Sequence, residues 1–138
     1  MEIAEAMYSE LTAAARRAAG HAYCPYSRFP VGAAVLTDRN EIFSGCNVEN
    51  ASYGLTLCAE RNAVFQAVSQ SQDGLAIRVV IVYTPTPEPT APCGACRQVI
   101  NEFGPDAEIV SICDGERVIR SDLASLLPQA FGPGSLTP

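Results

Sequence analysis

Basic residues are scarce in this chain. Its 138 residues include only nine Lys and Arg against 15 Asp and Glu, and the formal net charge is −6. Because affinity for a phosphate backbone rests on Lys and Arg contacts, this charge disfavours tight binding of nucleic acid. A small or uncharged partner fits the composition better.

Long apolar runs are also missing. No stretch reaches the roughly 18 consecutive apolar residues that a membrane span needs. The N-terminal stretch MEIAEAMYSELTAAARRAAG lacks a basic segment followed by an apolar one, which argues against a signal peptide. We therefore expect a soluble, cytoplasmic protein that does not bind membranes.

Histidine is nearly absent, whereas cysteine is not. The chain has one histidine, His21, and six cysteines. Disulfides are rare in cytosolic proteins, so cysteines at short fixed spacing are there more often metal-binding or catalytic. Such spacing is found at Cys58, Cys93 and Cys96. We expect the remaining three to be small buried apolar residues, namely Cys24, Cys46 and Cys113.

The hydrophobic pattern predicts an α/β fold in a single domain spanning residues 1–138, a usual length for one domain. Helices are expected at 3–19, 58–68, 93–103 and 121–128, the last with a serine cap, and strands at 31–37, 41–47, 77–84, 108–113 and 117–119. The segments 24–30, 48–57 and 85–92 are expected loops, and the tail 129–138 is expected to be irregular. This order, αββαβαββα, places helices on the faces of a mixed sheet.

The stretch PCGAC carries two cysteines at the start of a predicted helix. Pro92 suits a position at or next to the first helical residue, so Cys93 and Cys96 lie in the first turn. There the helix dipole favours a thiolate over a thiol. Cys58 also begins a predicted helix. Two helix N-termini directed at one point would therefore supply three thiolates to one Zn²⁺ ion.

Three cysteine ligands without a fourth indicate a catalytic zinc site. Structural zinc sites are closed by four protein ligands, whereas catalytic sites keep a position open for water. Glu60 follows Cys58 by two residues and is the expected base for that water. Arg61 and Arg97 flank the cysteines, and we expect both to donate hydrogen bonds to sulfur and to restore Lewis acidity to the metal.

Two other interpretations of these residues stay open. A lone CxxC pair in a cytosolic protein can be a redox dithiol, as in thioredoxin-like motifs. The zinc site can also be purely structural, closed by His21 or Cys24 as the fourth ligand. We expect His21 to be a surface or capping residue instead.

The two stretches CAE and PCGAC together resemble the zinc nucleoside and nucleobase deaminases, whose signature is H-x-E…P-C-x-x-C. Cysteine replaces the signature histidine at position 58. That variant is similar to the small homotetrameric cytidine deaminases, and the likeness runs through CPYSRFPVGAAVL, SGCNVENASYGLTLCAERNAV and PCGACRQVINEFG. It implies a three-layer α/β/α fold with a mixed central sheet of about five strands. It also implies one Zn²⁺ per subunit and a homotetramer.

The resemblance further implies roles for individual residues. Glu60 would shuttle protons, and the metal ligands would be Cys58, Cys93 and Cys96. The nucleoside would be bound through the ribose hydroxyls by Asn47 and Glu49, through the pyrimidine face by Phe29, and through the base edge by the backbone at Ala59. Aromatic residues completing a neighbouring subunit's site would be Tyr53 and Phe131. From the residues alone, Phe29 is equally a core residue and Asn47 a turn residue.

The implied reaction is hydrolytic deamination of cytidine and 2′-deoxycytidine to uridine and 2′-deoxyuridine, with release of ammonia, in pyrimidine salvage. One alternative is a deaminase of another cytosine-bearing nucleoside such as blasticidin S. In that case we would not expect the Asn47 and Glu49 pair. A second alternative is a non-catalytic zinc module in which the metal only holds two helices together.

Overall fold

The computed structural model describes residues 3–71 and 73–137. Its strands are β1 (Gly32–Thr37), β2 (Ile42–Cys46), β3 (Ile77–Tyr83), β4 (Glu108–Ile112) and β5 (Ile119–Asp122). Its helices are α1 (Glu5–Ala19), α2 (Ala59–Gln70), α3 (Gly94–Phe103), α4 (Leu123–Leu126) and α5 (Pro133–Leu136), with one 3-10 turn, η1 (Tyr53–Leu55). Gln72 and Pro138, expected in a polar segment and in the tail, lie outside the described residues. No described helix has the length and hydropathy needed to cross a membrane.

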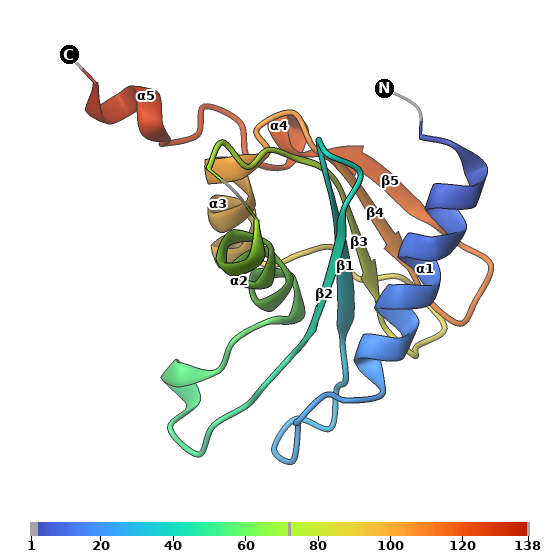
Figure 1. The fold of residues 1–138 in the computed structure, drawn as a ribbon. Coiled ribbons are helices and arrows are strands. Elements are labelled where there is room, and N and C mark those ends of the chain that lie inside the picture. Colours follow the sequence, from blue (N-terminus) through green and yellow to red (C-terminus); the bar gives the residue numbers. More distant parts are fainter. Residues whose placement is uncertain (1–2, 72, 138) are drawn as a thin grey trace.

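The five strands form one mixed sheet in the order β2-β1-β3-β4-β5. Strands β3 and β4 pair in parallel, and the other neighbours pair antiparallel. Helix α1 covers one face of the sheet, and α2 and α3 cover the other (Figure 1). The expected three-layer α/β/α architecture is confirmed.

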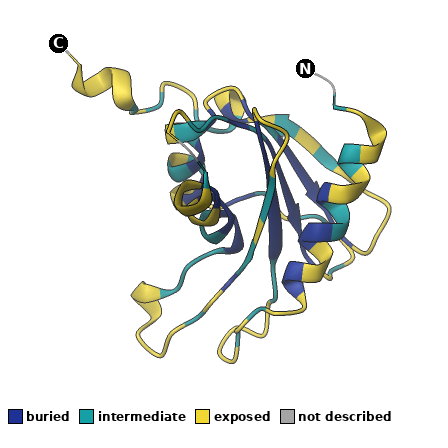
Figure 2. Cartoon of the chain, viewed as in Figure 1, coloured by how far each residue is buried: buried dark blue, intermediate teal, exposed yellow. Residues whose placement is uncertain are grey.

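The sheet is buried on both faces, as the apolar run in β3 predicts. Between α1 and the sheet, the core includes Leu11, Leu36 and Ile81. Between the sheet and the pair α2 and α3, it includes Val64 and Ile100. Figure 2 shows the buried residues concentrated on the sheet and on the helix faces turned toward it. The helix starts on the α2 and α3 side are therefore held by a packed core.

The expected boundaries fail mainly toward the C-terminus. The last strand spans Ile119–Asp122 and not 117–119, because β5 is an edge strand with alternating half-exposed residues and little apolar signal. Helix α4 is capped by Asp122, whose Oδ1 accepts a hydrogen bond from the Ser125 amide at 2.8 Å, and not by the expected serine. The tail contains the short helix α5, and the loop before α2 contains η1.

A glycine fixes the distance between the sheet and α2. A Cβ atom added at Gly45 in β2 would lie 2.5 Å from the Ala63 amide nitrogen and 2.8 Å from the Ala59 carbonyl oxygen. Real Cβ atoms do not approach backbone atoms this closely. The first two turns of α2 therefore lie directly on β2, and any side chain at position 45 would push the start of the helix away.

We expect Gly45→Ala to lower the free energy of unfolding by about 1–3 kcal/mol, the usual cost of overpacking a filled interior. Urea denaturation followed by circular dichroism measures this change. Gly134→Ala is the matched control, since a Cβ atom there meets nothing within 4 Å. Equal stabilities of the two variants would contradict the close packing of α2 on β2.

Candidate metal centre and active site

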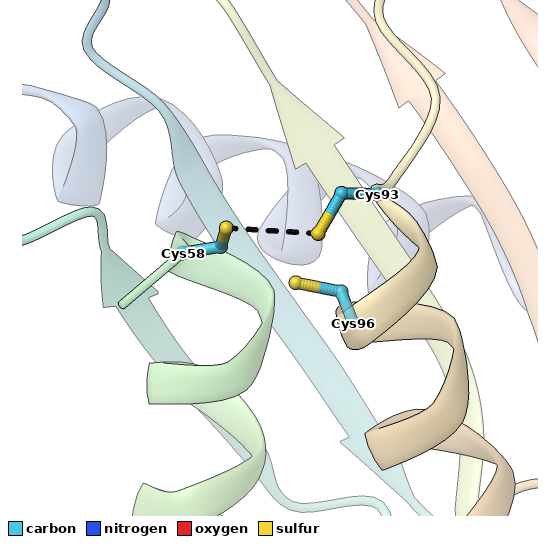
Figure 3. A group of neighbouring side chains, drawn as sticks. All are labelled: Cys58, Cys93 and Cys96. Carbon is cyan, nitrogen blue, oxygen red and sulfur yellow. Dashed lines mark hydrogen bonds between the residues drawn. The ribbon is translucent and has the colours of Figure 1, made fainter. Parts of the chain in front are cut away.

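The helices α2 and α3 begin side by side on the same face of the sheet. Cys58 is the N-cap residue of α2, and Cys93 is the N-cap residue of α3, each with extended backbone geometry. Cys96 lies in the first turn of α3 and is fully buried. Figure 3 shows the three sulfur atoms turned toward one another from the two helix starts. The expected convergence of three cysteines from two helix starts is confirmed, but Cys93 is the N-cap residue of α3 and does not lie in its first turn.

The sulfur geometry fits a tetrahedral zinc site. All three Sγ atoms lie within 4.8 Å of one another, and the Cys58 and Cys93 sulfurs are 3.8 Å apart. With Zn–S bonds of about 2.3 Å, tetrahedral geometry separates the sulfurs by about 3.8 Å. A redox pair would use only two of these sulfurs and leave the third without a role.

Three cysteines are positioned to hold a metal ion at this centre. Within residues 3–71 and 73–137, the three cysteines are the one group of at least three His, Cys, Asp or Glu side chains close enough to hold a metal. His21 is exposed and lines a separate cavity between the end of α1, β2 and α2. Cys24 is also outside the group, so neither residue closes the site as a fourth ligand.

The local environment favours a thiolate at Cys58. Hydrogen bonding from the Cys96 thiol, followed by that from Arg61, lowers the pKa of Cys58 to about 5. The Arg61 Nη2 atom lies 3.4 Å from the Cys58 Sγ atom. The same hydrogen bond to Cys58 raises the pKa of Cys96. Since metal ligands must be deprotonated, Cys58 is the thiol best prepared for binding.

The two arginines behave differently. Arg61 contacts sulfur, as expected, and a cation at this place offsets the charge of three thiolates. Arg97 instead donates to backbone carbonyls, with Nε 2.8 Å from the Pro92 oxygen and Nη1 3.0 Å from the Leu126 oxygen. In the described part of the chain, the expected bond from Arg97 to sulfur is not formed. Arg97 ties the segment entering α3 to the end of α4.

Glu60 is a buried carboxyl group next to the metal ligands. It lies in the first turn of α2 and is only 4% exposed. Burial, reinforced by negative charge on Cys58, raises the pKa of Glu60 to about 7. A carboxyl group with this pKa can both accept and return a proton near neutral pH, which is what general acid–base catalysis requires.

One cavity of about 400 Å³ connects the metal ligands with the candidate substrate-binding residues. This volume lies within the usual range for small-molecule sites. Of the residues expected to contact metal or substrate, the cavity is lined by Phe29, Asn47, Glu49, Cys58, Ala59, Glu60 and Cys93. These residues come from the loop before β1, the end of β2, and the starts of α2 and α3.

Tyr53 and Phe131 do not line this cavity. Tyr53 is 75% exposed on η1, where its ring lies 5.7 Å from that of Tyr26. Phe131 is 60% exposed beyond α4, and its carbonyl accepts hydrogen bonds from Gln98 and Asn101 on α3. Both aromatic rings are exposed on the surface of their own chain, where a second protein chain could contact them.

Several residues that line the cavity were not predicted from the sequence. Hydroxyl groups come from Ser27, Thr56, Thr84 and Thr90. Thr84 directly follows β3, and the carboxyl ends of parallel strands are where ligands of α/β proteins bind. The position of Thr84 after a predicted buried strand could therefore have identified it as a cavity residue from the sequence. Thr90 lies in the proline-rich segment before α3, where composition predicts only a loop.

The cysteines outside the centre match the expectation in part. Cys113 is buried, as expected, and its Sγ lies 3.4 Å from the Pro87 carbonyl oxygen. Cys24 and Cys46 are half-buried, so full burial was a wrong prediction for these two. Cys46 lines the separate surface hollow near His21.

We expect Cys93→Ala to abolish stoichiometric zinc binding, because two remaining thiolates cannot hold the ion against competing chelators. Atomic absorption on protein dialysed against a mild chelator measures the zinc content. Cys24→Ala, which removes a thiol outside the group, should retain one zinc per chain. A zinc-replete Cys93→Ala protein would exclude this ligand set.

Comparison with known proteins agrees with this geometry. Residues 6–113 match the family model of the cytidine and deoxycytidylate deaminase zinc-binding region. A cytidine deaminase of Sporosarcina psychrophila is 44% identical over 130 residues, which cover 93% of each chain. The crystal structure of a cytidine deaminase from Burkholderia pseudomallei is similar with a TM-score of 0.83 and 46% identity, covering 90% of this chain and 98% of that one. That of the Mycobacterium tuberculosis enzyme is similar with a TM-score of 0.76 and 42% identity, covering 91% and 97%. The chain belongs to the zinc-dependent cytidine and deoxycytidylate deaminase family.

Proposed function

We propose that this protein hydrolyses the exocyclic amine of cytidine and 2′-deoxycytidine, giving uridine or 2′-deoxyuridine and ammonia, and so serves pyrimidine salvage. The observation that carries the proposal is the single cavity joining three elements: a three-sulfur metal centre, the buried Glu60, and the polar and aromatic residues of the β1 and β2 region. Relatives that cover nearly the whole chain and are named cytidine deaminases support it.

A Zn²⁺ ion held by Cys58, Cys93 and Cys96 would lower the pKa of a water molecule to about 7. Glu60 accepts a proton from the attacking water and passes a proton to N3 of the cytosine ring, which prepares C4 for addition of the water oxygen. The same carboxyl group then carries the remaining proton from the new C4 hydroxyl to the exocyclic nitrogen, which leaves as ammonia while the C4 carbonyl forms. One carboxyl can make these transfers because it lies beside the metal ligands and lines the substrate cavity.

The remaining cavity residues bind and orient the nucleoside. Phe29, which is 38% exposed, offers a face on which the pyrimidine packs. The backbone at Ala59 binds the base edge. The ribose hydroxyls are bound by Asn47 and by Glu49, whose Oε1 already accepts hydrogen bonds from the Tyr26 and Ser27 amides. The second carboxylate oxygen of Glu49 is thereby left for the sugar.

The proposal extends to assembly and location. We expect residues 1–138 to act as one domain in a cytoplasmic homotetramer with one zinc ion per subunit. Tyr53 and Phe131 would reach the cavity of a neighbouring subunit, which accounts for aromatic rings left exposed on their own chain. The net charge of −6 supports a nucleoside and not a nucleic acid as substrate.

We expect Glu60→Gln to keep its zinc but to lose deamination by about 100- to 10,000-fold, the usual contribution of a positioned general acid–base group. The fall in absorbance of cytidine measures the rate, and deoxycytidine, cytosine, adenosine and blasticidin S define the substrate class. Glu102→Gln, which changes an exposed carboxylate on α3, is the matched control. Full activity in Glu60→Gln would exclude the proposed proton shuttle, and preference for blasticidin S would exclude the proposed substrate.

If each active site is completed by Tyr53 of a neighbouring subunit, two inactive variants should complement each other. Glu60→Gln and Tyr53→Ala should each be nearly inactive, yet their co-expression should restore part of the activity. A mixed assembly contains sites in which an intact Glu60 meets an intact Tyr53 from the neighbouring chain. Light scattering gives the mass of the assembly. A monomer, or the absence of any restoration in mixed tetramers, would contradict shared sites.

A further inference from the structure

The segment that carries Phe29 has no regular structure of its own. Residues 24–31 form neither helix nor strand, and Arg28 adopts a positive φ of 57°. Within the segment, the Arg28 amide donates to the Cys24 carbonyl at 2.9 Å, and the Phe29 amide donates to the Ser27 hydroxyl at 3.1 Å. The Tyr26 and Ser27 amides also donate to the Glu49 Oε1 atom, so the first half of the segment is held there. None of these bonds reaches the backbone on the far side of Phe29.

The side chain of Asn47 forms a hydrogen bond to the backbone on each side of Pro30. Its Nδ2 donates to the Phe29 carbonyl at 2.8 Å, and its Oδ1 accepts from the Val31 amide at 2.8 Å. Pro30 has no amide hydrogen that a side chain could bond. The Phe29 carbonyl and the Val31 amide are the backbone groups beside it that can take such a bond. One amide side chain therefore bridges the residue that bears the ring and the residue that enters β1.

The Asn47 bridge is shielded from solvent. Asn47 is only 8% exposed, so water competes little for its two hydrogen bonds. A side-chain amide has two N–H donors and two acceptor lone pairs, and the bridge uses one of each. One donor and one acceptor remain for a ligand in the cavity that Asn47 also lines.

The backbone of Asn47 holds the neighbouring chain independently of its side chain. Its amide donates to the Val31 carbonyl at 3.3 Å, and its carbonyl accepts from the Tyr23 amide at 3.0 Å. Removing the side chain leaves these bonds in place. The loss should therefore release Phe29 and Pro30, while Val31 stays bonded to the Asn47 backbone amide and the sheet stays folded.

We infer that Asn47 is a positioning residue, whose side-chain amide holds the Phe29 ring against the substrate cavity through the backbone on either side of Pro30. This role rests on the proposed function, because a cytosine base in the cavity is what the Phe29 ring would pack on. The role is separate from any contact between Asn47 and the sugar. Binding of the sugar at Asn47 and packing of the base on Phe29 then depend on one side chain.

Fluorescence tests this role without any substrate. The chain contains no tryptophan, so Phe29→Trp introduces a single reporter. In this background Asn47→Ala should make the indole clearly more accessible to acrylamide quenching. Asn47→Asp, which keeps the acceptor for Val31 but loses the donor to Phe29, should also raise quenching above the parent. Asn50→Ala is the matched control, because Asn50 is exposed and its side-chain oxygen accepts a hydrogen bond from the Ser52 amide. Unchanged quenching in Asn47→Ala and Asn47→Asp would overturn the inference.

Kinetics separate positioning from contact with the sugar. Asn47→Ala should reduce kcat/KM for cytidine by about 10- to 100-fold, as misplaced substrate groups do. The same loss should persist with 3′-deoxycytidine, which lacks a ribose hydroxyl, and should shrink when Phe29→Ala is already present. A loss that vanishes with 3′-deoxycytidine and is unaffected by Phe29→Ala would overturn the inference. If the parent protein deaminated no cytidine, the proposed function would fail, and the quenching result would still decide the role of Asn47.

Discussion

Three sulfur atoms within 4.8 Å of one another are the constraint on which the rest of the site depends. Three thiolates at this distance repel strongly unless positive charge lies among them. The protein supplies it from two helix N-termini and from Arg61, whose Nη2 lies 3.4 Å from the Cys58 sulfur. A divalent cation completes the compensation. The helix start that carries Cys58 also buries Glu60, so the proposed metal ligand and the proposed proton shuttle share one rigid element.

The sheet holds this arrangement in place. Helices α2 and α3 are separate in sequence and meet only because both pack on one face of a sheet whose central strands are buried on both sides (Figure 1). Gly45 allows α2 to lie directly on β2, and β2 then leads into Asn47 at the cavity. The start of α2, which carries Cys58, and the end of β2, which leads into Asn47, are therefore fixed to each other through close backbone contacts.

Much of this was predictable, because the signals are local. Cys58, Cys93 and Cys96 are recognisable from spacing and from their places at helix starts, and the continuous apolar run of β3 identifies a central strand. What could not be predicted depends on distant contacts or on weak patterns. Arg97 sits beside a cysteine in sequence, but its guanidinium reaches the carbonyls of Pro92 and Leu126. The half-exposed edge strand β5 carries too little apolar signal to fix its ends. Ser27, Thr84 and Thr90 join the cavity only through the fold.

The central claim is that the metal centre has three sulfur ligands and one position open to water, as catalysis requires. X-ray absorption at the zinc edge tests it most directly on the purified protein. We expect three sulfur neighbours at about 2.3 Å and one oxygen neighbour at about 2.0 Å, and we expect the oxygen neighbour to be replaced when a ligand enters the cavity. A closed shell of four protein ligands, unchanged by any nucleoside, would contradict it.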